Sequence, residues 1–161
     1  MKKCVFAGSF DPFTNGHKDI VDRCLKMYDC IYIAVLNNQD KKTFFNDEER
    51  FSFIESLYAN DDRVRVCYFD GLLVDFMKAN DITVNVRGLR NADDYKYENN
   101  MHFYNGDMYK ELITVYIPCP LNLSHVSSSS VRSLIKAGAD VSPYVPEVIA
   151  KQISKTLENK R

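Results

Sequence analysis

The sequence lacks several features that would place a protein at a membrane or on nucleic acid. No apolar run reaches the roughly eighteen residues that a membrane-spanning helix needs. The net charge at pH 7 is only −1, because 21 basic side chains are offset by 22 acidic ones. The chain therefore has no overall positive field of the kind that attracts nucleic acid or a membrane surface. We expect neither among its partners.

The cysteines also lack a pattern. The chain has five of them, an odd number, and none are paired at the CxxC spacing of a zinc site. Cys4, Cys24 and Cys67 lie in segments with apolar periodicity, where a buried free thiol is more common than a disulfide. Met1–Lys3 leads directly into an expected strand and does not resemble a signal peptide. These features predict a cytosolic protein.

The order of apolar segments predicts the fold. At 161 residues, 45% of them hydrophobic, the chain is expected to form a single domain over residues 1–161. Strand-like apolar runs alternate with segments of helical periodicity. The expected strands are 4–7, 31–36, 64–69, 83–86 and 112–117; the expected helices are 16–28, 47–59, 72–79 and 93–104, with two more starting near 128 and 146. This alternation predicts an α/β fold with a doubly wound, five-stranded parallel sheet, Rossmann-like, whose ligands bind beyond the carboxyl ends of the strands.

The segment Gly8–His17 is the most informative part of the chain. It joins the first expected strand to the first expected helix through a glycine-containing turn. Such a turn directs backbone N–H groups and the positive end of the helix dipole at one point, which suits a phosphate. His17 adds a donor beside that point. The Ser9 hydroxyl either orients a phosphate oxygen or is an ordinary turn residue, and Asp11-Pro12 is expected to fix the turn.

Basic residues follow two further expected strands. Lys41 and Lys42 come after the second strand, where either could meet an anion, and their spacing from the strand does not choose between them. Arg87-Gly88-Leu89-Arg90 follows the fourth strand, and arginine is a planar, multi-donor partner for phosphate. We interpret this segment as an anion clamp. Downstream, Glu98 lies past the first turn of its helix and could accept hydrogen bonds from a ribose.

A run of serines, Ser127–Ser130, precedes the apolar residues of the next helix. A serine run can be a flexible linker, but here it leads straight into Val131 and Leu134, which indicates a helix start with serine caps. Hydroxyl groups and free N–H groups at a helix start form another site for an anion. The sequence therefore predicts several anion-binding elements near one edge of one sheet.

The Gly8–His17 pattern resembles the nucleotide-binding motif of the nucleotidyltransferase superfamily, whose members attack the α-phosphate of a nucleoside triphosphate. With Arg87–Arg90 and Ser127–Ser129 before Val131-Arg132, the chain resembles the phosphopantetheine adenylyltransferases from Cys4 to about Pro146. The resemblance implies a nucleotidyltransferase fold and reversible transfer of an adenylyl group from ATP to 4′-phosphopantetheine. The products are dephospho-coenzyme A and pyrophosphate, a step in coenzyme A biosynthesis. It also implies a homohexamer and Mg²⁺ carried by the ATP phosphates, with no metal site of the protein's own.

The same resemblance implies roles for individual residues. His17 would stabilise the transition state. The residues expected at phosphopantetheine are Ser9, Lys41, Leu73 and Arg87, and it is the resemblance that selects Lys41 over Lys42. The residues expected at ATP are Ser9, Phe10, His17, Gly88, Leu89, Arg90, Glu98, Leu123, Ser124, His125, Val126, Ser127, Ser128 and Ser129.

Three other functions compete with this interpretation. Another small nucleotidyltransferase, acting on nicotinamide mononucleotide or using CTP, would share the first motif, but Lys41 and the pair Arg87 and Arg90 argue against it. A non-catalytic nucleotide sensor would not need to keep His17 and both anion-binding segments. A dinucleotide-dependent oxidoreductase is disfavoured because no GxGxxG follows the first strand.

Overall fold

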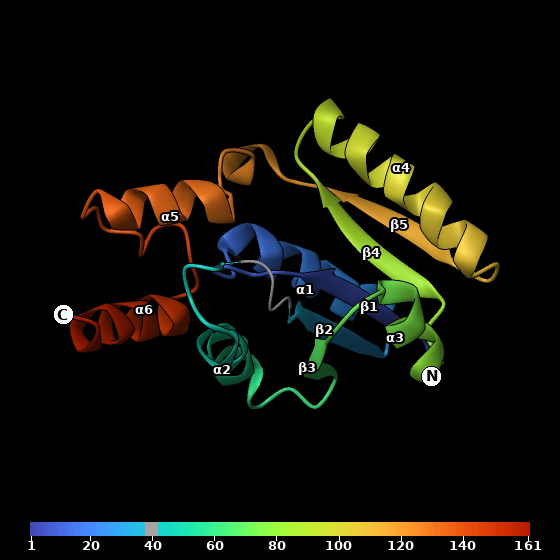
Figure 1. Cartoon of the computed structure of the whole chain (residues 1–161), viewed down its shortest axis with the longest axis horizontal. Coiled ribbons are helices and arrows are strands. Elements are labelled where there is room, and N and C mark those ends of the chain that lie inside the picture. The colour runs from blue at the N-terminus through green and yellow to red at the C-terminus, as the bar shows by residue number, and fades with distance from the viewer. Residues whose placement is uncertain (38–41) are drawn as a thin grey trace.

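A parallel five-stranded sheet forms the centre of the computed structural model, which describes residues 1–37 and 42–161 (Figure 1). The strands are β1 (Lys3–Gly8), β2 (Cys30–Leu36), β3 (Val64–Phe69), β4 (Val84–Leu89) and β5 (Ile113–Pro118). They pair in parallel in the order β3-β2-β1-β4-β5. The predicted fold class, a doubly wound parallel sheet, is thereby confirmed.

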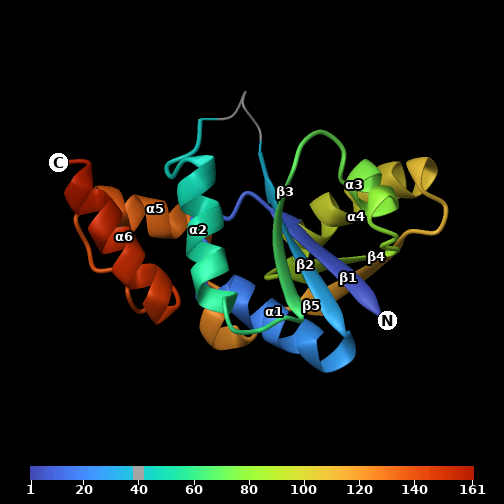
Figure 2. The same cartoon turned by 90° about the horizontal axis from the view of Figure 1, so that it is seen from below.

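Helices cover both faces of the sheet. One face carries α1 (Asn15–Met27), α2 (Asp47–Tyr58), α5 (Ser128–Lys136) and α6 (Glu147–Asn159); the other carries α3 (Leu73–Ala79) and α4 (Ala92–Met108). In Figure 2 the sheet lies between α1 on one side and α3 and α4 on the other. A short 3-10 helix, η1 (Leu121–Leu123), follows β5. None of the helices in the described part of the chain is both long and apolar enough to cross a membrane.

Burial on both faces explains why the sequences of the central strands are continuously apolar. In β1, Cys4 and Phe6 point into the core shared with α1, α2, α5 and α6, whereas Val5 and Ala7 point into the core on the α3 side. Successive side chains of a strand face opposite sides of the sheet, so a strand covered on both faces must be apolar at every position. The continuous pattern that predicted a covered sheet therefore has this physical cause.

Strand β4 differs from its predicted range. The sequence predicted that it ends at Val86, with the arginine segment in the following loop. In the structure β4 continues to Leu89, because Arg87, Gly88 and Leu89 pair with residues 116–118 of β5. Arg87 is therefore held by the sheet, and only Arg90 lies in the turn that follows.

Local signals at the helix ends are largely confirmed. Asn46 and Glu49 have the three-residue spacing of a capping box, and in the structure the Asn46 side chain caps α2 while Glu49 completes the box. The serine run forms the predicted cap of α5, with Ser127 as the N-cap. Proline is common in the first turn of a helix, but Pro146 occupies the N-cap position before Glu147. All five cysteines are free thiols; Cys67 and Cys119 are only partly buried.

The strand order creates a crevice at one edge of the sheet. From β1 the chain builds outward through β2 to β3, then returns to place β4 on the other side of β1. The connections that leave the carboxyl ends of β1 and β4 therefore diverge, and ligands of such sheets bind at this point.

Candidate active site

One cavity, of about 770 Å³, opens where the connections from β1 and β4 diverge. Its walls come from the loop after β1, the first turn of α1, the end of β4, the start of α4, segment 42–44 and the first turns of α5. Of the residues predicted to bind ligands, the cavity is lined by Ser9, Phe10, His17, Arg87, Gly88, Leu89, Arg90, Glu98, Val126, Ser127, Ser128 and Ser129. The fold thus gathers three separate sequence motifs around one space.

Thr14 caps α1 and also orients His17. The backbone N–H of Thr14 donates to Nδ1 of His17 at 2.9 Å, while the backbone N–H of His17 donates to the Thr14 hydroxyl oxygen at 3.4 Å. Because Nδ1 accepts a bond from a backbone N–H, the neutral ring carries its proton on Nε2. His17 is therefore held in one tautomer, with Nε2–H as the ring's donor.

The surroundings of His17 keep its ring uncharged. The rings of Phe10, Phe13 and Phe6 lie with their centroids 5.1, 5.3 and 5.9 Å from that of His17. Burial among these rings, together with the charges of Arg87 and Arg90, lowers the pKa of His17 to about 3. At neutral pH, His17 can therefore stabilise an anion by donating a hydrogen bond, and it contributes no net charge.

Phe10 lies in the loop after β1, with its ring against that of His17. Its φ of 49° lies in the left-handed region, which few non-glycine residues adopt. Its ring is 3% exposed and packs so closely over Gly8 that a Cβ there would lie 3.3 Å from the ring. The Phe10 ring thus serves as a packed wall of the cavity beside His17.

Two arginines face the cavity in contact with carboxylates of α4. Nε and Nη2 of Arg87 donate to the two oxygens of Glu98 at 2.9 and 2.8 Å, and Nη1 donates to the carbonyl oxygen of Ala7. Arg90 donates through Nε and Nη2 to Asp94 at 3.0 and 3.2 Å. Burial raises the pKa of Asp94, but the hydrogen bonds and charge of Arg90 lower it. The net result is a pKa below the ordinary value. The predicted phosphate ligands are therefore already engaged by internal carboxylates.

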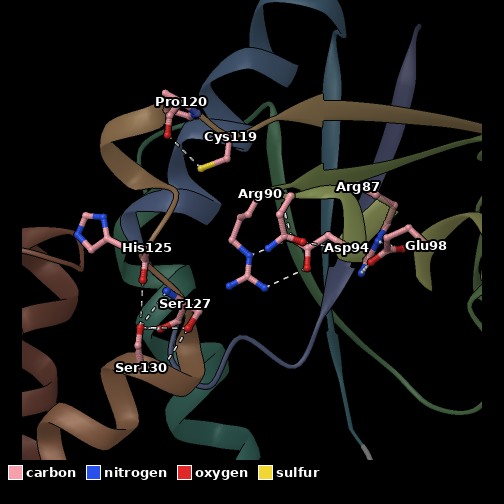
Figure 3. A network of polar contacts seen from close by, with 10 residues as sticks. Arg87, Arg90, Asp94, Glu98, Cys119, Pro120, His125, Ser127 and Ser130 are labelled. Carbon is pink, nitrogen blue, oxygen red and sulfur yellow. Dashed lines mark hydrogen bonds and ion pairs between the residues drawn. The ribbon is translucent and has the colours of Figure 1, made fainter. Parts of the chain in front are cut away.

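Figure 3 shows these two pairs beside the serine-rich start of α5. Ser127 and Ser130 form a reciprocal cap, in which each side chain accepts a bond from the backbone N–H of the other residue. The Ser128 hydroxyl donates to the carbonyl oxygen of Pro12 at 2.8 Å, which joins α5 to the loop after β1. The start of α5 thus meets the cavity opposite the arginines.

Several predicted ligand-binding residues do not line this cavity. Leu73, Leu123, Ser124 and His125 all lie outside its walls. His125 is exposed, and its ring points away from the two arginines (Figure 3). Lys41, selected for phosphopantetheine, lies outside the described residues. Their assignments remain predictions.

Other cavity residues were not selected from the sequence. Lys42, the alternative to Lys41, lines the cavity, as do Arg132 and Lys136 of α5. Arg132 donates to the carbonyl oxygen of Asp11 at 2.8 Å. Ser128, Arg132 and Lys136 recur every four residues and so share one face of α5. That spacing is the signal that could have identified the two basic residues.

The carboxylates in the cavity do not form a metal site of their own. Within residues 1–37 and 42–161, no group of three or more His, Cys, Asp or Glu side chains is arranged to hold a metal ion. Glu98 and Asp94 both accept hydrogen bonds from arginines. Both carboxylates are therefore already engaged within the protein.

Comparison with known proteins agrees with this geometry. Residues 5–134 match the family model described as cytidylyltransferase-like. The phosphopantetheine adenylyltransferase of Thermotoga neapolitana is 42% identical over 158 residues, which cover 98% of each chain. That of Streptococcus mutans is 41% identical over 158 residues, or 98% of this chain and 95% of the relative. The similarity extends over the strands, the cavity and both C-terminal helices, so the chain belongs to the phosphopantetheine adenylyltransferase family.

Proposed function

We propose that the protein transfers the adenylyl group of ATP to 4′-phosphopantetheine and releases pyrophosphate. The observation that carries this proposal is the uncharged, single-tautomer His17 at the centre of a cavity lined by arginines and a helix start. Such a site suits two anionic substrates, and its family membership identifies them. The product is dephospho-coenzyme A, and the reaction is reversible.

The reaction depends on alignment of the two substrates rather than on proton transfer. The attacking group is a phosphate monoester whose second pKa is about 6, so at neutral pH it is mostly dianionic and needs no general base. One of its oxygens attacks the α-phosphorus, a new P–O bond forms, and the bond from the α-phosphorus to the bridging oxygen breaks. Pyrophosphate leaves with that electron pair. The protein must hold two anions in line and stabilise the charge that develops between them.

His17 is placed to act on the α-phosphoryl group. Its Nε2–H donates to a non-bridging oxygen as charge builds there, and Thr14 keeps the donor oriented by holding Nδ1. Because the pKa of His17 is low, the ring is a neutral donor in the free protein at neutral pH. A preorganised donor of this kind is worth about 10²–10³ in rate.

The remaining roles divide between the two substrates. Ser9, Lys41, Leu73 and Arg87 bind the acceptor. ATP is bound by Ser9, which serves both substrates, and by Phe10, Gly88, Leu89, Arg90, Glu98 and residues 123–129, with the serine-rich helix start at the leaving phosphates. The internal pairs of Arg87 with Glu98 and Arg90 with Asp94 hold each arginine in a planar, bidentate geometry that a phosphate can also accept.

When bound with ATP, Mg²⁺ would neutralise charge on the triphosphate. The described residues fit an ion that arrives with ATP, since Glu98 and Asp94 are engaged by arginines and phosphate oxygens supply the ligands that Mg²⁺ prefers. Arg90 and the start of α5 then hold the nucleotide to which the ion is bound.

A homohexamer and a cytosolic location complete the proposal. Helix α4 has no buried residue and exposes Tyr95, Tyr97, Phe103 and Tyr104, the last at 68%. Tyr97 and Tyr104 are seven residues apart and share one side of the helix, and aromatic side chains are enriched in subunit contacts. Light scattering should report six times the chain mass, and Tyr104→Ser should lower it.

Free thiols at all five cysteines suit a reducing compartment.

The test is pyrophosphate release from purified protein with ATP, Mg²⁺ and 4′-phosphopantetheine. Matched reactions replace the acceptor with nicotinamide mononucleotide or ATP with CTP. Rapid release only in the first reaction is expected. Faster release with either substitute would assign a different nucleotidyltransferase activity, and tight ATP binding without release would indicate a nucleotide sensor.

A further inference from the structure

The loops that follow β1 and β2 are joined by a buried carboxylate. Asp11, in the loop after β1, is 5% exposed. Its Oδ2 accepts from the backbone N–H of Phe44 at 2.8 Å, and its Oδ1 accepts from that of Phe45 at 2.9 Å. Both oxygens are therefore used to hold the segment before α2 against the loop before α1.

A buried arginine joins the same two loops from the other side. Arg50 lies in the first turn of α2, is 1% exposed and pairs with Asp47. Its guanidinium donates to the carbonyl oxygen of Ser9 in the first loop. It also donates to the carbonyl oxygens of Leu36 and Phe45, each at 3.2 Å, at the two ends of the connection after β2. One side chain thus links three points of backbone.

Two buried charges are a costly way to hold loops together. Removing a charge from water is unfavourable unless its hydrogen bonds are replaced, and apolar packing often gives equal or greater stability. What directional bonds add is a single defined arrangement of the groups that they join. The carboxylate uses N–H groups of residues 44 and 45, while the guanidinium uses the carbonyl groups of Ser9, Leu36 and Phe45.

The joined loops form two different walls of the cavity. The loop after β1 contributes Ser9 and Phe10 and leads to His17, whereas the segment before α2 contributes Lys42, Thr43 and Phe44. In the proposed reaction the first wall acts on the α-phosphate of ATP. The second wall follows β2, where the acceptor phosphate is expected. A displacement of about 1 Å between reacting groups can cost on the order of 100-fold in rate.

We propose that Asp11 and Arg50 are positioning residues that fix the distance between the ATP-binding loop and the acceptor-binding segment. They act through the backbone of these loops, because their own polar atoms are occupied. The inference rests on the proposed function. It assigns to these residues the alignment of the two phosphates, which no single loop provides alone.

The test compares conservative variants at both positions. Asp11→Asn removes one of the two bonds, because an amide nitrogen cannot accept from an N–H. Arg50→Lys keeps the charge but loses the planar fork. Each variant should lower kcat about 10- to 100-fold and raise KM for 4′-phosphopantetheine, while the Kd for ATP from calorimetry stays within about 3-fold of wild type. A purely structural role would lower the melting temperature and leave kcat of the folded enzyme unchanged.

Matched controls make the same chemical changes away from the cavity. Asp29 also accepts a bond from a distant backbone N–H, that of Lys2 at 2.7 Å, next to the amino ends of β1 and β2. Arg65 of β3 donates to the hydroxyl oxygen of Tyr32 on β2, at a distance of 3.0 Å. Asp29→Asn and Arg65→Lys should therefore leave kcat and both Michaelis constants unchanged.

The outcomes separate this inference from the proposed function. If wild-type protein releases no pyrophosphate, the proposed function fails. If the wild type is active and folded Asp11→Asn and Arg50→Lys match it in kcat, the positioning role is overturned. Losses as large in the two controls would overturn it as well. Should Arg50→Lys fail to fold, Asp11→Asn and Asp11→Glu decide, because both leave Arg50 in place.

Discussion

Two of the helices that border the cavity, α1 and α4, are attached to the sheet in different ways. Helix α1 buries Ile20, Val21 and Cys24 in the core, whereas none of the residues of α4 is buried. Helix α4 instead contacts the sheet through the pair of Glu98 with Arg87, a hydrogen bond of His102 to Thr114, and the edge-to-face packing of Tyr95 on Tyr116, with ring centroids 5.6 Å apart. One wall of the cavity thus depends on buried apolar packing, and the other on half-exposed polar and aromatic contacts.

This difference predicts which wall affects the reaction rate and which affects substrate binding. A wall held by packing keeps a donor such as His17 fixed, because a close-packed core has few alternative arrangements. A wall held by ion pairs can exchange partners, because a phosphate competes for the same guanidinium groups as a carboxylate. We expect the wall formed by α1 to govern the rate and the pairs at α4 to govern binding of each substrate.

The largest effect should follow removal of the donor on the packed wall. His17→Ala should lower kcat about 10²–10³-fold, because the developing charge loses a preorganised donor. The Kd for ATP from calorimetry should change little. His102→Ala removes a histidine of α4 that lies outside the cavity and should retain wild-type kcat. Near-normal turnover in folded His17→Ala would contradict the assignment.

The arginines should separate the two substrates by binding. Arg87→Ala should raise the Kd for 4′-phosphopantetheine about 10-fold or more, and Arg90→Ala should do so for ATP, since a hydrogen bond to a charged group contributes about 1.5–3 kcal/mol. Separate binding isotherms for each ligand measure this. Equal losses for both ligands in both variants would mean that the arginines are not divided between substrates.

Glycine substitutions should show that the contact between β4 and α1 tolerates an added methyl group less well than helix α4 does. A Cβ on Gly88 of β4 would lie 2.3 Å from Cδ1 of Ile20, so Gly88→Ala should cost about 1–3 kcal/mol of unfolding free energy. Gly106 of α4 has open space around it, so Gly106→Ala should stabilise the helix by about 0.5–1 kcal/mol. Urea titration measures both. Adding Ile20→Val should recover part of the loss at Gly88, and no recovery would exclude this contact as its cause.

The pH dependence of stability should report on the packed wall. The pKa of His17 is lowered from 6.5 in the unfolded chain to about 3, so protonation favours unfolding. The stabilisation is complete above pH 6.5 and is lost as the pH falls from 6.5 toward 3. Between pH 7.5 and pH 5, wild type should lose about 1–2 kcal/mol more unfolding free energy than His17→Gln. Parallel losses would mean that the His17 ring is not buried as described.

Much of the site could be predicted because its motifs are local. The turn at Gly8–His17, the cap at Ser127 and the capping pair of Asn46 with Glu49 are each written within a few residues. The extension of β4 was missed because it depends on pairing with β5, which lies more than twenty residues further along the chain. Spacing alone could not choose between Lys41 and Lys42, because spacing along a loop does not reveal which side chain faces a cavity.

By itself, the sequence determined the fold class and the position of the motifs that line the cavity, because apolar periodicity and capping act over one or two turns of chain. Only the tertiary structure decided how those motifs are held. The pairing of Arg87 with Glu98, the low pKa of His17 among phenylalanine rings, and the bonds of Asp11 and Arg50 all join different segments. Such contacts depend on distances that arise only when the strands assemble, so no local pattern encodes them.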